Sequence, residues 1–356
     1  MTSFAQLLRW LGPWTSPSRA PPGIERSAIQ IDNRFEAWLY RPRRPTGAYL
    51  VAPGLHYEGP ADPRMDRFCR VLAQAGHLVL APFLPDYADL MVRESVIADL
   101  GHAFDALLDL PLPVRRPGVF SISFGSLPAL RLAADPARRD RVGGLVVFGG
   151  FADFGAAIRH CLGVGPADTP RDPLNQPVVL MNLLEDLDSV PADTEAVVKG
   201  WRAFVEATWG RPEMKSPDRF LPVAETLGHH LQGDARRLYR IGVGLDPGIW
   251  PLCEPALTRR VARAPYLDPR PWLHAVECPV HVVHGLDDDV MPPDQLPALE
   301  AALPRGRTNT YLTGLYGHTG PDQRHSPSNR VSSALREGRT LIGVLRALSA
   351  AGHDRL

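Results

Sequence analysis

The chain alternates short apolar runs with amphipathic stretches, and this alternation predicts its strands and helices. Residues 27–32 and 34–40 alternate apolar with polar positions on either side of Asp32-Asn33, which indicates a β-hairpin at a sheet edge. Continuous apolar runs predict strands buried on both faces at residues 48–52, 77–82, 118–122 and 144–148. Apolar positions at helical spacing predict helices at residues 64–75 and 94–110, and a third helix from about residue 125.

The strand and helix rhythm stops after residue 150 and returns at residue 279. The intervening sequence is broken by prolines and predicts helices near residues 176–187, 193–209, 220–231 and 235–242. After it we expect a strand at 279–284, a helix at 293–303, a strand at 308–312 and a helix at 332–348. This order predicts an α/β fold with a doubly wound, mostly parallel sheet. The core is expected at residues 1–151 and 275–356, with a helical cap or lid inserted at 152–274.

Residues 118–125 join a predicted strand to a predicted helix through a sharp turn at Ser123. A serine at the apex of such a turn is a nucleophile elbow, which needs small residues two positions before and after it. Ser121 and Gly125 occupy those positions, although the common pattern has glycine at both. The alternative is a serine in an ordinary strand-to-helix connection.

A second strand end carries Pro53-Gly54-Leu55. Acyl transfer develops an oxyanion, which two backbone N–H groups can stabilise. We expect one from Phe124, the residue after the nucleophile, and the other from Leu55. His56 is the alternative donor, because the usual histidine before the glycine is missing, and a simple Pro-Gly turn is the alternative structure.

Candidates for an acid and a base follow two later strands. Residues 284–293 end a buried strand and contain three aspartates, of which Asp288 is favoured to orient the histidine. Asp287 and Asp289 are the alternatives within the loop, and Asp153 is a weaker competitor after an earlier strand. The glycine-rich segment 311–320 carries His318, which would take the proton from Ser123 and return it to the leaving group. His325 lies seven residues further on and is interpreted as surface loop.

Composition narrows the functional class. Among 356 residues, 39 Lys and Arg balance 39 Asp and Glu, so no global charge favours nucleic acid or an anionic membrane. The four cysteines show neither zinc spacing nor a Cys-x-x-Cys pair, which suits a reducing cytosol and predicts a cytoplasmic protein. The serine-hydrolase chemistry expected of Ser123 implies no metal or organic cofactor. Residues 1–14 indicate a short amphipathic helix against the core or a membrane surface. No run approaches the ~20 apolar residues of a transmembrane helix.

The order Ser123, Asp288, His318 resembles that of the α/β-hydrolase superfamily. The resemblance covers residues 28–150 and 275–350, rests also on segments 53–54, 75–82 and 278–289, and points to bacterial members of unassigned substrate. It implies a serine hydrolase acting on a carboxylic ester, with thioesters and lactones open. The expected partner is an apolar acyl substrate, and a homodimer is compatible with this interpretation. An acyltransferase with the same triad and an inactive binding protein are the alternatives.

The inserted block carries large apolar side chains, namely Trp201, Phe204, Trp209, Phe220 and Trp250. An independent domain needs such residues for its own core. A lid needs some of them to face the pocket, where they would bind an apolar acyl group and exclude water. The hypothesis is that residues 152–274 roof Ser123 and set chain-length preference.

Overall fold

The structure is a computed structural model that describes residues 2–165, 169, 171–315 and 330–353. Its sheet has eight strands in the order β1-β2-β4-β3-β5-β6-β7-β8. The strands are β1 (Glu25–Ile31), β2 (Phe35–Arg41), β3 (Gly47–Ala52), β4 (His77–Pro82), β5 (Gly118–Ile122), β6 (Gly144–Phe148), β7 (Val280–Gly285) and β8 (Thr308–Thr313). β2 pairs antiparallel with β1 and β4, and the pairs from β4 to β8 are parallel. The order and the reversed β2 are those of the α/β-hydrolase fold, so the predicted fold is confirmed.

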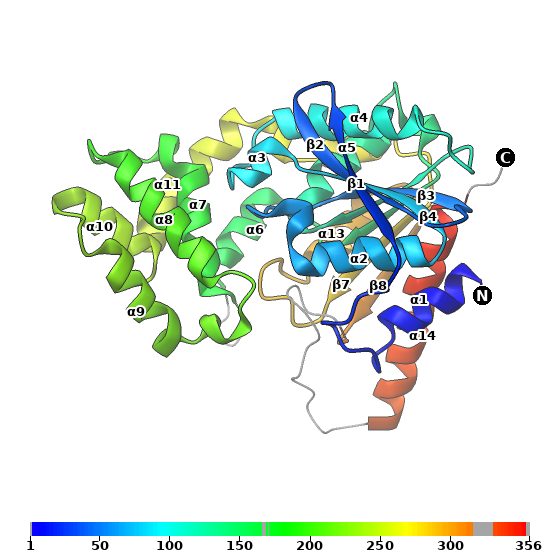
Figure 1. Cartoon of the computed structure of the whole chain (residues 1–356). Helices are drawn as coiled ribbons and strands as arrows, with labels where there is room; N and C mark the ends of the chain where they lie inside the picture. The colour runs from blue at the N-terminus through cyan, green and yellow to red at the C-terminus, as the bar shows by residue number, and fades with distance from the viewer. Residues whose placement is uncertain (1, 166–168, 170, 316–329, 354–356) are drawn as a thin grey trace. The chain divides into compact units, whose positions relative to one another are not determined.

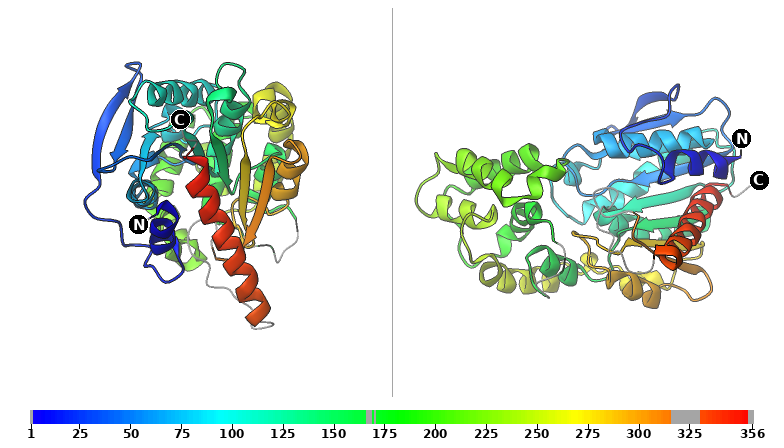
Figure 2. Two further views of the ribbon diagram at one scale, coloured as in Figure 1. Left: turned by 90° about the vertical axis from the view of Figure 1, so that its right-hand side faces the viewer. Right: turned by 90° about the horizontal axis from the view of Figure 1, so that it is seen from below.

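The predicted hairpin forms one edge of this sheet. Asp32 and Asn33 lie between β1 and β2 with φ of 49° and 54°. Aspartate and asparagine tolerate this left-handed conformation better than most residues, which is why they mark the turn. Figure 2 shows β1 and β2 in blue at one edge of the sheet and β8 in orange at the other.

Helices cover both faces of the sheet because successive strand residues point to opposite sides. In β3, Leu50 packs into one core cluster while Tyr49 and Val51 pack into the other. The first cluster includes residues of α4 (Ser95–Leu108), α5 (Ser126–Ala134), α12 (Arg270–Leu273) and α13 (Gln295–Ala302). The second includes residues of α1 (Ser3–Leu11), α2 (Pro63–Gln74) and α14 (Arg330–Ala351) (Figure 1). Both faces are therefore buried, as the continuous apolar strand sequences predict.

The predicted N-terminal helix is α1, and it packs on the second cluster. Its Leu7 and Trp10 are buried there. Within the described part of the chain, no helix combines the length and apolar character needed to cross a bilayer. Cys69, Cys161, Cys253 and Cys278 are all buried free thiols.

The chain forms two compact units. The sheet unit consists of Met1–Ala152, Asp268–Asp287 and Pro293–Leu356, and the helical unit of Asp153–Leu267 and Asp288–Pro292. The helical unit contains α6 (Phe154–Cys161), α7 (Gln176–Leu183), α8 (Thr194–Thr208), α9 (Pro217–Gly228), α10 (Gly233–Gly242) and α11 (Ile249–Arg263). Because α6 follows β6 and α11 precedes β7, these helices form an insert between two neighbouring strands of the sheet.

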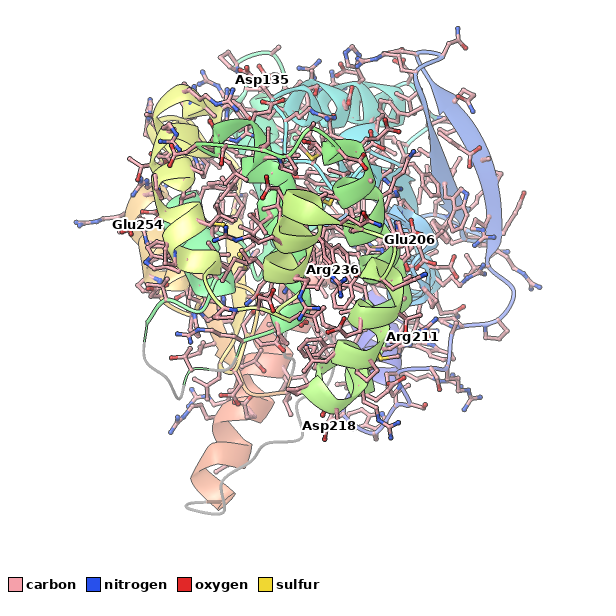
Figure 3. All side chains as sticks on the ribbon, turned by 90° about the vertical axis from the view of Figure 1, so that its left-hand side faces the viewer. Asp135, Glu206, Arg211, Asp218, Arg236 and Glu254 are labelled. Atoms are coloured by element: carbon pink, nitrogen blue, oxygen red, sulfur yellow. The ribbon has the colours of Figure 1, made fainter. Side chains whose placement is uncertain are left out.

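The helical unit has its own core. Trp201 is fully buried, and its indole Nε1 donates to the carbonyl of Tyr239 at 3.2 Å. Phe204 and Phe220 form an edge-to-face pair in the same unit, with ring centroids 6.2 Å apart. Figure 3 shows charged side chains such as Arg236 on the same set of helices, and Arg236 is exposed. Three of the five aromatic residues assigned to a lid are therefore used in the packing of the helical unit itself.

Two helices of this unit, α6 and α11, were not among the predicted elements. The sequence of α11 does not look helical because it contains two prolines, Pro251 in its first turn and Pro255 in its interior. Pro251 costs little there because first-turn N–H groups have no acceptor within the helix. Pro255 removes a helical hydrogen bond, but the buried residues Cys253 and Leu257 hold the helix through tertiary packing.

Candidate active site

Ser123 sits at a strained backbone position at the end of β5. It follows Ile122 directly and begins a 3₁₀ turn, η2 (Ser123–Gly125), that leads into α5. Its φ is 54°, in the left-handed region that residues other than glycine rarely adopt. Such a conformation costs about 1–3 kcal/mol and persists only where the surrounding structure enforces it. The candidate nucleophile therefore stores strain, as expected of an elbow.

The residues on either side of the serine explain how the turn closes. A Cβ atom on Gly125 would lie 2.3 Å from the carbonyl oxygen of Pro53, so only glycine fits this close approach. Ser121 is fully buried, and its hydroxyl has no hydrogen-bond partner among the described residues. Serine at 121 thus fits the crowded position, although it leaves a polar atom unsatisfied.

The expected oxyanion loop lies against the serine. A Cβ atom on Gly54 would lie 3.4 Å from the Cβ atom of Ser123, so the two backbones are adjacent. Within the described residues the amide of Leu55, the next residue, has no acceptor. The carbonyl of Phe124 accepts a hydrogen bond from the buried hydroxyl of Tyr87 at 2.7 Å. An unpaired amide beside a strained serine is the arrangement that oxyanion stabilisation requires.

Tyr87 is a site residue that sequence reasoning missed. It lies in the short helix α3 (Pro85–Ala88), which no periodic pattern announces, and it is almost fully buried. By binding the Phe124 carbonyl it fixes the peptide between Phe124 and Gly125, within the turn that begins at Ser123. Nothing local to residue 87 signals this contact, because its partner is 37 residues away in the chain.

His56, the alternative donor, belongs to a cluster with Glu58 and Asp62. One potential ligand atom of each residue lies within 4.8 Å of the others, a spacing that could hold a metal ion. However, Nε and Nη2 of Arg64 bind both oxygens of Asp62, at 3.0 and 2.6 Å. Burial lowers the pKa of His56 to about 4, although the negative charge of Asp62 acts to raise it. The group therefore fits an ion pair with a neutral histidine better than a metal centre.

The strand order brings the turn at Ser123 and the end of β7, which precedes Asp288, to one edge of the sheet. Ile122 pairs with Phe148, and Phe148 pairs with Val283 of β7. Because these strands are parallel, their carboxyl ends meet at one edge, where ligands bind in such sheets. β7 then ends at Gly285, three residues before Asp288.

The candidate acids have different environments within the helical unit. Asp288 is 1% exposed, and its Oδ1 accepts hydrogen bonds from the amides of Val290 (2.9 Å) and Met291 (2.7 Å). Asp289 instead forms an ion pair with Lys215. Asp153 caps α6 by accepting from the amide of Ala156 at 2.9 Å. Of these three candidates, Asp288 is the one that combines deep burial with a carboxylate held by amides of its own loop.

The candidate base, His318, and His325 lie outside the described residues. The strand leading to them is anchored at its end, because Glu337 of α14 accepts hydrogen bonds from the Gly314 amide and the Thr313 hydroxyl, both at 3.0 Å. This contact joins segments that are distant in sequence. The sequence did not reveal this contact of Glu337 with the end of β8.

No protein-family model matches the chain, and no curated protein matches its sequence. Solved structures with a similar fold include the 2,6-dihydroxy-pseudo-oxynicotine hydrolase, at 14% identity over 93% of this chain and 68% of that one, with a TM-score of 0.46. A puromycin-hydrolyzing peptidase of Mycobacterium tuberculosis is 17% identical over 93% of this chain, with a TM-score of 0.47, and this chain spans 39% of it. An alpha/beta fold family hydrolase of Bacillus anthracis str. Sterne is 14% identical over 90% and 99% of the two chains, with a TM-score of 0.43. We draw neither activity nor substrate from likenesses of this degree.

Proposed function

We propose that this chain is a serine hydrolase that cleaves a carboxylic ester through an acyl-enzyme. The observation that carries the proposal is the strained Ser123 packed against the loop that presents the Leu55 amide, which has no acceptor among the described residues. A buried turn held at this cost, with an amide donor beside it, fits nucleophilic attack on a carbonyl better than a structural connection.

In the proposed mechanism, His318 removes the proton from the Ser123 hydroxyl as its Oγ attacks the ester carbonyl. The amides of Leu55 and Phe124 stabilise the oxyanion of the tetrahedral intermediate. Collapse of that intermediate expels the alcohol, which takes the proton from His318 and leaves an acyl group on Ser123. Water, activated by the same histidine, then releases the acid, while Asp288 orients the histidine throughout.

The proposed cap is residues 152–274. Trp201, Phe204 and Phe220 are buried in the helical unit, and the half-buried Trp209 donates its indole N–H to the carbonyl of Leu174 at 3.1 Å. Of the five aromatic residues, the half-buried Trp250 is therefore the remaining candidate for contact with an apolar acyl group. An ester panel from acetate to laurate tests this idea. If Trp250→Ala leaves the chain-length preference of the wild type unchanged, Trp250 does not set it.

A fluorophosphonate probe tests the nucleophile directly. The probe should label the wild type and the control Ser121→Ala, whose buried hydroxyl has no described partner, but not Ser123→Ala. Turnover of p-nitrophenyl esters should fall by roughly four to six orders of magnitude in Ser123→Ala. Labelling that survives in a folded Ser123→Ala variant would contradict the proposal. Adding an alcohol acceptor distinguishes acyl transfer, which would yield a new ester instead of the acid.

A further inference from the structure

The acid loop, residues Asp288–Pro292, packs with the helical unit although it lies between β7 and α13 in the sequence. Two backbone carbonyls of this loop are bound by that unit. The carbonyl of Asp289 accepts from the Asp172 amide at 2.9 Å, and the carbonyl of Val290 accepts from the Cys161 thiol at 3.4 Å. The insert thus contacts two successive peptides of the loop, those that follow Asp289 and Val290.

A buried charge cluster adds a third attachment. Lys215 ends the 3₁₀ turn η6 (Pro212–Lys215), and its Nζ lies 3.1 Å from a carboxylate oxygen of Asp172 and in direct contact with that of Asp289. The Asp172 and Lys215 side chains are 6% and 24% exposed, so the pair is largely shielded from solvent. Burial alone would lower the pKa of Lys215, but the attraction of Asp172 and Asp289 outweighs burial and raises it. Lys215 therefore stays charged and holds two carboxylates together.

The shape of the acid loop decides where the Asp288 carboxylate points. Its Oδ1 is held by the amides of Val290 and Met291, so any movement of that backbone moves the carboxylate. A displacement of about 1 Å in a catalytic group can cost roughly 100-fold in rate. Contacts that fix residues 289 and 290 therefore also fix Asp288.

We propose that Lys215 and Asp172 are positioning residues through which the insert holds the acid loop in its catalytic shape. The inference rests on the proposed function and extends it, because it makes the insert part of the machinery that orients the triad. Lys215 acts on the ester only through Asp289 and the loop. Its loss leaves the buried carboxylate of Asp172 and the partly buried carboxylate of Asp289, 6% and 19% exposed, without their shared cation.

Steady-state kinetics on Lys215→Met tests the proposal. We expect kcat for p-nitrophenyl esters to fall by about 10- to 100-fold with KM changed little, because the role proposed for Asp288 is to orient the histidine and not to bind the ester. Lys215→Arg should recover most of kcat, because it restores the cation. The matched control is Lys199→Met, which breaks an exposed pair with Glu195 on α8 and should keep the wild-type kcat.

Neutralising the carboxylates of Asp172 and Asp289 distinguishes the loss of their contacts with Lys215 from a simple loss of stability. The triple variant Lys215→Met/Asp172→Asn/Asp289→Asn carries no unpaired buried charge, so it should fold even if Lys215→Met does not, and it should still turn over slowly. A wild-type kcat in either folded variant, or a raised KM with unchanged kcat, overturns the positioning role. If Ser123→Ala remains active, the proposed function fails and the inference fails with it. If Ser123→Ala is inactive and Lys215→Met is normal, only the inference fails.

Discussion

Gly125→Ala is the most direct test of how the elbow is built. The added methyl would lie 2.3 Å from the carbonyl oxygen of Pro53 and 2.7 Å from that of Ala52. Real Cβ atoms essentially never lie within 3.0 Å of another heavy atom, so the turn and the end of β3 must separate by at least about 0.7 Å. Both obstructing atoms belong to the backbone, so no side chain can rotate out of the way.

The expected cost follows from that geometry. Overpacking a tight core typically lowers the free energy of unfolding by about 1–3 kcal/mol. Because the obstacle here is backbone, we expect Gly125→Ala to lose about 3 kcal/mol. The displaced backbone carries Ser123 on one side and Gly54 with Leu55 on the other. A shift approaching 1 Å between the proposed nucleophile and the proposed oxyanion donor should lower kcat/KM by roughly 100-fold.

Two measurements check this expectation against a control. Urea unfolding gives the loss of stability, and p-nitrophenyl ester kinetics with fluorophosphonate labelling gives the loss of activity. The control is Gly338→Ala in α14, where a Cβ atom meets nothing within 4 Å, so activity should be unchanged and stability should rise by about 0.5–1 kcal/mol. If Gly125→Ala keeps wild-type stability and kcat/KM, the close approach of the elbow to β3 is wrong.

Three further predictions concern strain, anchoring and pH. Ser123→Gly should be more stable than Ser123→Ala by about 1 kcal/mol in urea unfolding, because glycine adopts a φ of 54° without strain; equal stability would argue against a strained serine. Glu337→Gln weakens the acceptor for the Gly314 amide and the Thr313 hydroxyl and should lower kcat about 3- to 10-fold, measured with the same esters, whereas unchanged kcat would show that this anchor does not matter. Burial, with a smaller effect of His353, lowers the pKa of His77 from 6.5 to about 3. Between these two pH values His77 is therefore protonated in the unfolded chain and neutral in the folded chain. The free energy of unfolding should therefore fall as pH drops below 6.5, and His77→Gln should reduce that slope by up to about 1.4 kcal/mol per pH unit; equal slopes in urea titrations would refute this.

Patterns that act over a few neighbouring residues could be predicted from the sequence. Continuous apolar runs identify β3 to β6 as strands buried on both faces, because each side of such a strand must be covered. Asp32-Asn33 marks the hairpin because these side chains tolerate positive φ. The strand, turn and helix around Ser123 are likewise predictable, since the elbow requires small residues at fixed spacing.

The tertiary structure decided what depends on contacts between distant segments. Three consecutive aspartates look equivalent in the sequence, yet the amides of Val290 and Met291 bind Asp288 while Lys215, 74 residues away, pairs with Asp289. The contacts of Tyr87 and Glu337 could not be predicted from sequence periodicity, because their partners belong to other elements. α11 forms despite its prolines because burial of its apolar residues outweighs a lost hydrogen bond. Local propensity and periodicity reach only a turn or two along the chain, whereas the environment of a charged or polar side chain is set by whatever the fold packs beside it.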